Sequence, residues 1–364
     1  MSTQDGLYIG IMSGTSLDAI DVALIAMQGE QPSLVASHEH PLTDTLRQDI
    51  LALCQPGEEE IRRAGLLHLA LGHVFAEAVL RLMTQQRLAA EQIVAIGSHG
   101  QTVRHHPELG FSLQLGSADV IATRTGITTV TDFRNHDMVL GGQGAPLVPT
   151  FHQTLFGKTG EKCALVNIGG MANVSLLDGQ QLIAGFDTGP GNVLLNLWAE
   201  RHTGKPYDES GRFAASGKLA PELLTRLLED DFFQVQGPKS TGRERFNADW
   251  LSDRLSGSEI PADVQATLTE LTAVSIARSL IGFAPAAVYL CGGGSKNDFL
   301  RERLARHLPN ARIDTTDALG WPADWIEAAC FAWLAWARCN RVAATSPCVT
   351  GASRAAISGA VYLP

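Results

Sequence analysis

Residues 7–26, LYIGIMSGTSLDAIDVALIA, decide how the chain begins to fold. An apolar run at residues 7–12 is followed by a small polar turn at residues 13–16 and by a second apolar run at residues 20–26. A third run of strand-forming residues lies at 33–38. Short apolar runs separated by turns of this kind predict three antiparallel strands at the start of a sheet.

Helical patterns follow these strands. Apolar residues recur at helical spacing over residues 43–54 and 58–87, before an apolar run at residues 93–97 (IVAIG). A run that is apolar throughout and is reached through a helix is typical of a buried parallel strand. The second half repeats this order, from a strand at residues 163–170 (CALVNIGG) to a buried strand at residues 287–291 (AVYLC).

The strand–turn–strand unit therefore occurs twice, at residues 10–25 and 166–177. Each copy begins a run of strands that is followed by helices, so we expect two related α/β domains with a cleft between them. The expected domains are residues 1–130, joined by the C-terminal segment 340–364, and residues 131–339. A chain of 364 residues is long enough for two domains of ordinary size.

The composition excludes several classes of function. Lys and Arg number 28 and Asp and Glu number 38, which gives a formal net charge of −10. Binding to nucleic acid needs a basic surface, and the densest basic stretch, residues 239–245 (KSTGRER), is short and contains a glutamate. The longest apolar run, residues 328–337, is about half of a membrane span. We therefore expect neither a nucleic acid nor a membrane as a partner.

The cysteines and histidines do not suggest a metal site. The six cysteines are scattered, without a C-x-x-C pair or a zinc-binding spacing, and the first residues lack the basic region of an export signal. The 11 histidines include no H-E-x-x-H pattern. Scattered thiols are typical of a reducing compartment, so we expect a cytoplasmic protein.

Four glycine-rich turns follow buried strands and are the first candidate binding features. They lie at residues 13–16 (SGTS), 169–170 (GG), 189–192 (GPGN) and 292–294 (GGG). A glycine turn at a strand end lets backbone N–H groups approach a phosphate, because no Cβ is in the way. The alternative for each turn is that glycine only permits a tight bend. Four such turns in one chain favour nucleotide binding, although G-x-G-x-x-G is absent.

A carboxylate stands beside the third turn. Asp187 lies in residues 185–192 (GFDTGPGN), at the end of an expected strand and before an expected helix. A carboxylate in that position can accept a proton from an attacking hydroxyl or water. The alternative is an N-cap of the helix, which the intervening Gly189 and Pro190 disfavour. Asp18 and Asp21 flank the first turn, where Asp18 is a candidate for water-mediated Mg²⁺ binding and Asp21 is as compatible with a structural role.

Polar side chains end two further strands. His99 and Gln101 follow the strand at residues 93–97, so we expect their turn to open at the cleft and contact a ligand. The alternative for the histidine is a core position with its hydrogen bonds satisfied. Arg134 follows an expected strand at residues 128–133, and its fixed positive charge suits an acidic ligand. A surface ion pair explains that arginine equally well.

These residues resemble the signatures of the anhydro-N-acetylmuramic acid kinase family. The matching segments are residues 10–21 (GIMSGTSLDAID), 97–102 (GSHGQT), 132–134 (DFR), 141–147 (GGQGAPL), 167–170 (NIGG), 185–192 (GFDTGPGN), 237–244 (GPKSTGRE) and 291–294 (CGGG). They run in order through nearly the whole chain. The one departure noticed is Ala19, where many relatives have glycine.

The resemblance implies an α/β fold of two RNase-H-like domains, as in actin-like ATPases and sugar kinases, with the active site in the cleft. It implies that the 1,6-anhydro bond of 1,6-anhydro-N-acetylmuramic acid is hydrolysed while the 6-oxygen takes the γ-phosphoryl group of ATP. The products are N-acetylmuramic acid 6-phosphate and ADP, within peptidoglycan recycling. The resemblance also implies Mg²⁺ carried mainly by the ATP phosphates, and a homodimer.

The resemblance also assigns roles to residues. Asp187 matches the catalytic base that activates the attacking water. The residues expected at ATP are Gly14, Thr15, Ser16, Leu17, Asp18, Ala19, Ile20, Asp21, Asn167, Gly169, Gly170, Gly189, Gly191, Asn192, Gly292, Gly293, Gly294 and Asn297. The residues expected at the sugar are His99, Gln101, Arg134 and Glu327. We take Arg134 as the candidate partner of the acidic lactyl group, and the family places a carboxylate at Glu327.

Two alternatives remain at this point. The first is another sugar or acetate-type kinase of the same superfamily, and the second is an actin-like ATP-binding protein without catalytic activity. Phosphorylation of the anhydro sugar separates the kinase from the first alternative. Nucleotide-dependent polymerisation or peptide binding reveals the second.

Overall fold

The computed structural model describes residues 4–14, 17, 19–235 and 237–364, and the chain folds into two compact units. Unit 1 consists of Met1–Phe156 and Trp325–Pro364, and unit 2 of Gly157–Asp324. The expected domains were divided at 130/131 and 339/340, so the observed division differs at both places. The second boundary moves because of packing, since the helix that starts at Ile326 lies on the sheet of unit 1.

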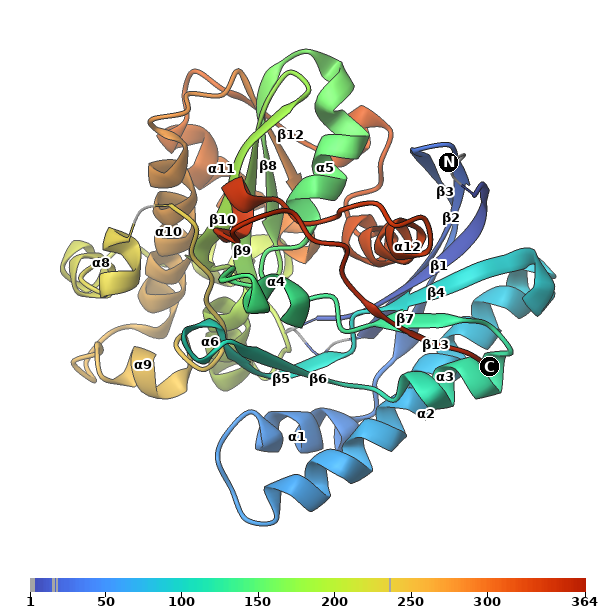
Figure 1. Ribbon diagram of the computed structural model, residues 1–364. Helices are drawn as coiled ribbons and strands as arrows, with labels where there is room; N and C mark the ends of the chain where they lie inside the picture. Colours follow the sequence, from blue (N-terminus) through green and yellow to red (C-terminus); the bar gives the residue numbers. More distant parts are fainter. Residues whose placement is uncertain (1–3, 15–16, 18, 236) are drawn as a thin grey trace. The chain divides into compact units, whose positions relative to one another are not determined.

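Unit 1 is built on a six-stranded sheet in the order β13-β7-β4-β1-β2-β3 (Figure 1). Its strands are β1 (Gly6–Ser13), β2 (Ala19–Gln28), β3 (Gln31–Pro41), β4 (Ile93–Ser98), β7 (Thr129–Thr131) and β13 (Ala360–Tyr362). The first three strands are antiparallel, and β4 and β7 continue the sheet in parallel with β1. A separate hairpin is formed by β5 (Gln101–His106) and β6 (Phe111–Leu115).

The helices of unit 1 cover both faces of this sheet. They are α1 (Asp44–Leu53), α2 (Glu60–Gln86), α3 (Ala118–Thr125), α4 (Asn135–Val139), α5 (Val148–Phe156), α12 (Ile326–Cys339) and α13 (Pro347–Thr350). Side chains of a strand alternate between the faces, so Ile9 and Ile11 point to α2 while Gly10 points to α12. Both faces are therefore buried, as the apolar sequence of β1 and β4 predicts.

Unit 2 repeats the strand plan of unit 1 in a five-stranded sheet of order β10-β9-β8-β11-β12. The strands are β8 (Lys162–Ile168), β9 (Met171–Asp178), β10 (Gln181–Pro190), β11 (Ala287–Cys291) and β12 (Arg312–Thr315). As in unit 1, three antiparallel strands come first and two parallel strands extend the sheet beside the first of them. This repeated order is that of an RNase-H-like fold, which confirms the expected fold class.

The helices of unit 2 are α6 (Val193–Thr203), α7 (Arg212–Ala215), α8 (Pro221–Leu228), α9 (Ala248–Ser252), α10 (Pro261–Leu280) and α11 (Asp298–His307). The central helix is α10, which contacts β9, β10 and four of the other helices. Its apolar side chains enter two clusters, one with the sheet and one with α6, α8 and α9. The sequence analysis did not single out this helix.

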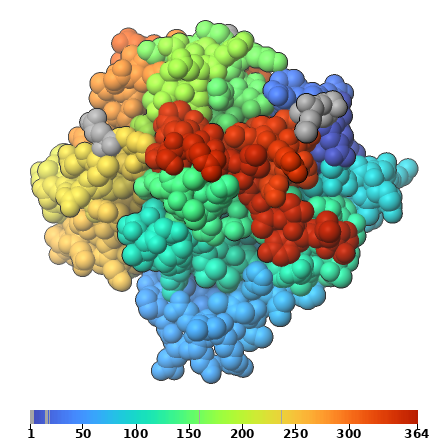
Figure 2. Space-filling view, viewed as in Figure 1, coloured from blue at the N-terminus to red at the C-terminus, as the bar shows by residue number. Residues whose placement is uncertain are grey.

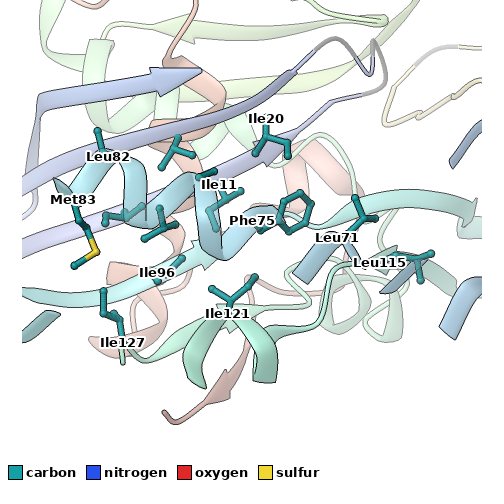
Figure 3. Close-up of a cluster of buried hydrophobic side chains, with 14 of the residues drawn as sticks. Ile11, Ile20, Leu71, Phe75, Leu82, Met83, Ile96, Leu115, Ile121 and Ile127 are labelled. Carbon is teal, nitrogen blue, oxygen red and sulfur yellow. The ribbon is translucent and has the colours of Figure 1, made fainter. Parts of the chain in front are cut away.

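The core of unit 1 lies between the sheet and α2 (Figure 3). Phe75 and Leu71 of α2 pack against Ile11 and Ile96 of the sheet, and all four side chains are fully buried. Helix α2 is long and apolar enough to cross a membrane by length and composition, which the sequence analysis overlooked. Nine of its residues are buried in unit 1, so it is a core helix.

The C-terminal segment completes unit 1 at its surface (Figure 2). Strand β13 pairs with β7, and the residues before it contact the segment that follows α4. The amide of Gln143 donates to the carbonyl of Thr350 at 2.8 Å, and the amide of Ser353 donates to the carbonyl of Leu140 at 2.9 Å. These bonds connect residues more than 200 positions apart in the sequence.

Two glycines allow α12 to lie directly on the sheet. A Cβ added to Gly10 of β1 would overlap the backbone of Ala328 in α12, and one added to Gly97 of β4 would overlap the carbonyl of Phe331. Neither contact can relax by a side-chain rotation, because the neighbouring atoms are helix backbone. The distance between α12 and the sheet therefore depends on the absence of side chains at these two positions.

We expect Gly97→Ala to destabilise unit 1 by about 3 kcal/mol, since α12 must move away from the sheet. Gly65→Ala is the matched control, because Gly65 lies on the exposed side of α2 with open space around it. That change should stabilise the protein by about 0.5–1 kcal/mol through helix propensity. Urea unfolding of both variants measures the difference. Equal stabilities would contradict the close packing of α12.

Candidate active site

The turn between β1 and β2 carries the first group of expected ATP ligands. Three of them lie outside the part of the chain that the structure describes: Thr15, Ser16 and Asp18. The side chains of Leu17 and Ile20 are buried in the core of unit 1, at 2% and 0% exposure. These two residues therefore offer a ligand their backbone only. Ala19 and Asp21 are half-buried at the start of β2, and Gly14 is half-buried after β1.

His99 is held by hydrogen bonds on both ring nitrogens. Its Nδ1 lies 3.2 Å from the carbonyl oxygen of Ser13, and its Nε2 lies 2.8 Å from Nη2 of Arg134. Because the arginine can only donate, Nε2 accepts and Nδ1–H donates to Ser13. Burial, and next the charge of Arg134, lower the pKa of His99 to about 3. The imidazole is therefore neutral and its tautomer is set by its neighbours.

Gln101 is also tied to the end of β1. Its Oε1 accepts a hydrogen bond of 2.6 Å from the hydroxyl of Ser13, and its side chain is 2% exposed. Ser13 thus contacts both His99 and Gln101, one through its carbonyl and one through its hydroxyl. The sequence analysis counted Ser13 only as part of a turn. The strand pairing of β1 with β4 is what brings these residues together.

Arg134 is fixed by two of its guanidinium nitrogens. Nη2 donates to His99, and Nη1 donates to the carbonyl of Gly144 at 2.7 Å. The position of Gly144 is set in turn by Asp137, whose Oδ2 accepts from the Gly144 amide at 2.9 Å and whose Oδ1 accepts from the Thr350 hydroxyl at 2.8 Å. Asp137 is fully buried, and the sequence analysis missed it. Because Asp137 is fully buried and bonded to both Gly144 and Thr350, it holds residues 132–137 in one conformation.

Glu327 lies in the first turn of α12, in the same part of unit 1. Burial, and next the charge of Glu327, raise the pKa of the Cys330 thiol well above its usual value, while the charge of Arg134 acts in the opposite direction. The ring of His99 packs on Phe331, with 4.8 Å between the ring centroids. The structure thus gathers His99, Arg134 and Glu327 around the start of α12.

The two glycine turns at 169–170 and 189–192 pack on each other in unit 2. The amides of Gly191 and Asn192 donate to the carbonyls of Gly170 and Gly169 at 2.9 and 2.8 Å. The Asn192 side chain donates to the carbonyl of Ile168 at 3.1 Å. The amides of this turn are thus used inside the protein, although the sequence analysis expected them to approach a phosphate.

Helix α10 holds this pair of turns from the other side. The hydroxyl of Thr272 donates to the carbonyls of Pro190 and Gly191, at 3.0 and 3.2 Å. Gly189 has a φ of +144° and lies against the ring of Phe233, so a side chain there would be strained and would clash. The end of β10 is therefore a rigid structure.

Asp187 stands on β10 just before this rigid turn. The residue is 6% exposed, and its Oδ2 accepts a hydrogen bond of 2.9 Å from the amide of Thr241. Its own amide donates to the carbonyl of Lys239 at 3.0 Å. Asn192, and not Asp187, is the N-cap residue of α6. The N-cap alternative for Asp187 is therefore wrong, and residues 239–241 are its observed neighbours.

The turn after β11 has two closely packed glycines and one open glycine. A Cβ on Gly292 would overlap the side chain of Asn167, and one on Gly294 would overlap Ile168. Gly293 has nothing within 4 Å of its Cβ position and is exposed. Asn297 is the N-cap of α11, since its Oδ1 accepts from the Leu300 amide at 3.0 Å. Its side-chain oxygen thus has a structural partner.

The chain has two RNase-H-like units with glycine turns at their strand ends, and the nearly buried Asp187 lies beside one of these turns. These features define the class of actin-like ATPases and sugar kinases. The chain belongs to the anhydro-N-acetylmuramic acid kinase family, whose sequence model matches residues 6–364. This membership makes it an ATP-dependent kinase of anhydro-N-acetylmuramic acid, an enzyme of peptidoglycan recycling.

Curated members of the family match along their full lengths. The anhydro-N-acetylmuramic acid kinase of Pseudomonas putida is 50% identical over 363 residues, covering 98% of this chain and 99% of that protein. The enzyme of Vibrio vulnificus is 46% identical and covers 100% of this chain and 99% of its own length. Among solved structures, a ROK family glucokinase from Streptomyces griseus matches with 14% identity and a TM-score of 0.41, covering 90% of this chain and 98% of its own. That likeness is too weak to say anything about the activity.

The buried state of His99 predicts a loss of stability in acid. Its pKa is about 3 in the folded protein against about 6.5 when unfolded, so only the unfolded chain binds the proton as the pH falls below 6.5. Its contribution to stability is present above pH 6.5, and about 2 kcal/mol of it is lost by pH 5. His99→Gln, which keeps an acceptor for Arg134, should remove that share of the loss. Urea unfolding at pH 7 and pH 5 measures it, and identical losses in both proteins would contradict the neutral histidine.

Proposed function

We propose that Asp187 is the general base of the kinase reaction. Its carboxylate takes a proton from a water molecule, the water oxygen bonds to C1 of the anhydro sugar, and the bond between C1 and O6 breaks. O6 then accepts the γ-phosphoryl group of ATP, which leaves N-acetylmuramic acid 6-phosphate and ADP. One sugar, one water and one ATP account for all the atoms, because the phosphate ester keeps the oxygen of the sugar and the proton on Asp187 is released to solvent.

The observation that supports this role is the environment of Asp187. It is a carboxylate with 6% exposure whose position is fixed by strand pairing with Asn173 and by the amide of Thr241. A base acts well when it is held in one orientation, and such positioning contributes a large part of enzymatic rates. The side chain also stands directly before a turn that α10 holds rigid, so it has a fixed place relative to the glycine backbone.

We propose that ATP is bound along the glycine turns of unit 2. At Gly191, Gly292 and Gly294 any side chain would overlap the protein itself, so these glycines are needed for packing. Gly293 is different, because its exposed backbone has room for a ligand. We place nucleotide contact there, and backbone contact at Gly14 in unit 1. Mg²⁺ usually keeps several waters and binds through phosphates, so we propose that it arrives mainly on those of ATP.

We propose that Arg134 binds the lactyl carboxylate of the sugar, with Glu327 as a hydrogen-bond acceptor for sugar hydroxyls. Arg134 has a planar group that suits a carboxylate, and its contacts with His99 and Gly144 hold that group in place. In this proposal His99 and Gln101 act on the sugar indirectly. Their polar atoms already bond to Ser13 and, for the histidine, to Arg134.

The cellular setting is also proposed. We place the enzyme in the cytoplasm as a homodimer that acts on a small anhydro amino sugar. None of the six cysteines takes part in a disulfide in the described part of the chain, which agrees with a reducing compartment. The homodimer rests on the resemblance to the family, and sedimentation of the purified protein tests it.

Asp187→Asn tests the base directly. The amide keeps the size of the carboxylate but cannot take the proton, so we expect turnover to fall by about 10²–10⁴ while ATP still binds. Mass spectrometry of a reaction in ¹⁸O-labelled water should show the label on C1 of the product and none in the phosphate ester. Label in the phosphoryl group, or near-normal turnover of the variant, would exclude the proposed mechanism.

Gly293→Val tests the nucleotide contact. The side chain meets no protein atom within 4 Å, so the fold should tolerate it while a branched group obstructs the ligand. We expect the affinity for ATP, measured by calorimetry, to fall at least about tenfold. Gly282→Val is the matched control, since Gly282 also has open space but lies after α10. If both variants bind ATP as tightly as the parent protein, Gly293 is not at the nucleotide.

A further inference from the structure

The segment Gly237–Asn247, hereafter the 237–247 loop, covers Asp187 in unit 2. The carbonyl of Lys239 accepts from the Asp187 amide at 3.0 Å, and the amide of Thr241 donates to the Asp187 carboxylate at 2.9 Å. The loop thus bonds to both the backbone and the side chain of the proposed base. What holds the loop then decides how firmly the carboxylate is oriented.

A buried carboxylate, Asp230, anchors the loop. Its side chain is 7% exposed, and it accepts hydrogen bonds from Nε and Nη2 of Arg245 on the loop, the former at 2.9 Å. It also accepts from Nε1 of Trp250 at 2.7 Å, from Nη2 of Arg254 at 3.2 Å and from the amide of Phe232 at 3.0 Å. These charge-assisted bonds hold the pKa of Asp230 below its usual value, against the opposing effect of burial.

Two further contacts strengthen the anchor. Phe246 of the loop is fully buried among Phe232, Phe233 and Trp250. The ammonium of Lys239 donates to the carbonyls of Phe232 and Val235, at 3.0 and 2.9 Å. Burial lowers the pKa of this lysine, while the charge of Asp187 acts in the opposite direction. The loop is therefore bonded at both ends to the segment that Asp230 begins.

We propose that Asp230 is a positioning residue for the reaction, acting through Arg245 and the 237–247 loop to keep the Thr241 amide on the Asp187 carboxylate. This inference rests on the proposed role of Asp187 as base. Asp230 itself touches no substrate, and its effect on turnover passes through the loop. Asp230 accepts side-chain hydrogen bonds from one residue of the loop, Arg245, and from two residues in or just after α9, Trp250 and Arg254.

That difference gives a matched pair of variants. Arg245→Gln and Arg254→Gln each remove one guanidinium group from the same carboxylate, and the remaining donors keep Asp230 hydrogen-bonded. Only Arg245 belongs to the loop. We expect Arg245→Gln to lower kcat about tenfold or more with the KM for ATP unchanged, because a base displaced by a fraction of an ångström loses much of its effect. Arg254→Gln should keep kcat within about twofold, and Arg245→Lys should restore part of the loss.

A double-mutant cycle between Arg245→Gln and Asp187→Asn shows whether the loop acts through the base. If it does, the double variant is no slower than Asp187→Asn alone, because the base is already lost. Losses that multiply, or equal kcat values for the two arginine variants, would overturn the positioning role. Near-normal turnover of Asp187→Asn would instead show that the proposed base itself is wrong. Thermal melting of every variant checks that the folds are intact.

Discussion

The direct contact of α12 with the sheet of unit 1 is the constraint on which that unit depends. Gly10 and Gly97 let the helix backbone touch two neighbouring strands, and no other residue type fits there. This contact brings the C-terminal part of unit 1, which begins at Trp325, onto strands formed at the start of the chain. It also decides where the first turn of α12 lies, with Glu327 at its start and Phe331 against His99.

The polar contacts of unit 1 follow from that placement. Once β1, β4 and α12 are fixed, the Ser13 carbonyl, the His99 ring and the Arg134 guanidinium form a continuous line of hydrogen bonds. Each group has one arrangement that satisfies its neighbours, because the histidine is neutral and the arginine only donates. The line continues through Gly144 to Asp137 and Thr350, so the C-terminal segment also helps to hold Arg134.

In unit 2, buried hydroxyl and carboxylate groups hold the segments around Asp187 in place. Helix α10 buries hydroxyl groups among its apolar side chains. The hydroxyl of Thr272 donates to the carbonyls of Pro190 and Gly191, which follow Asp187 in the chain. The Asp230 carboxylate accepts hydrogen bonds from Phe232, Arg245 and Trp250, and these bonds hold the 237–247 loop in place. A buried group of this kind stabilises only if all its partners are present, which makes the surrounding structure specific. Asp187 therefore stands in an environment with little freedom.

The sequence by itself determined the repeated strand order, the glycine turns and the position of Asp187 near the end of a strand. It could do so because alternating and continuous apolar runs report on burial, and glycine reports on backbone crowding. The tertiary structure alone decided that Leu17 and Ile20 face the core. It also decided that the amides of Gly191 and Asn192 donate to Gly170 and Gly169, that Thr241 donates to Asp187 and that Arg245 donates to Asp230. Those contacts join residues 15 to 54 positions apart through backbone amides and buried carboxylates, which leave no periodic pattern in the sequence.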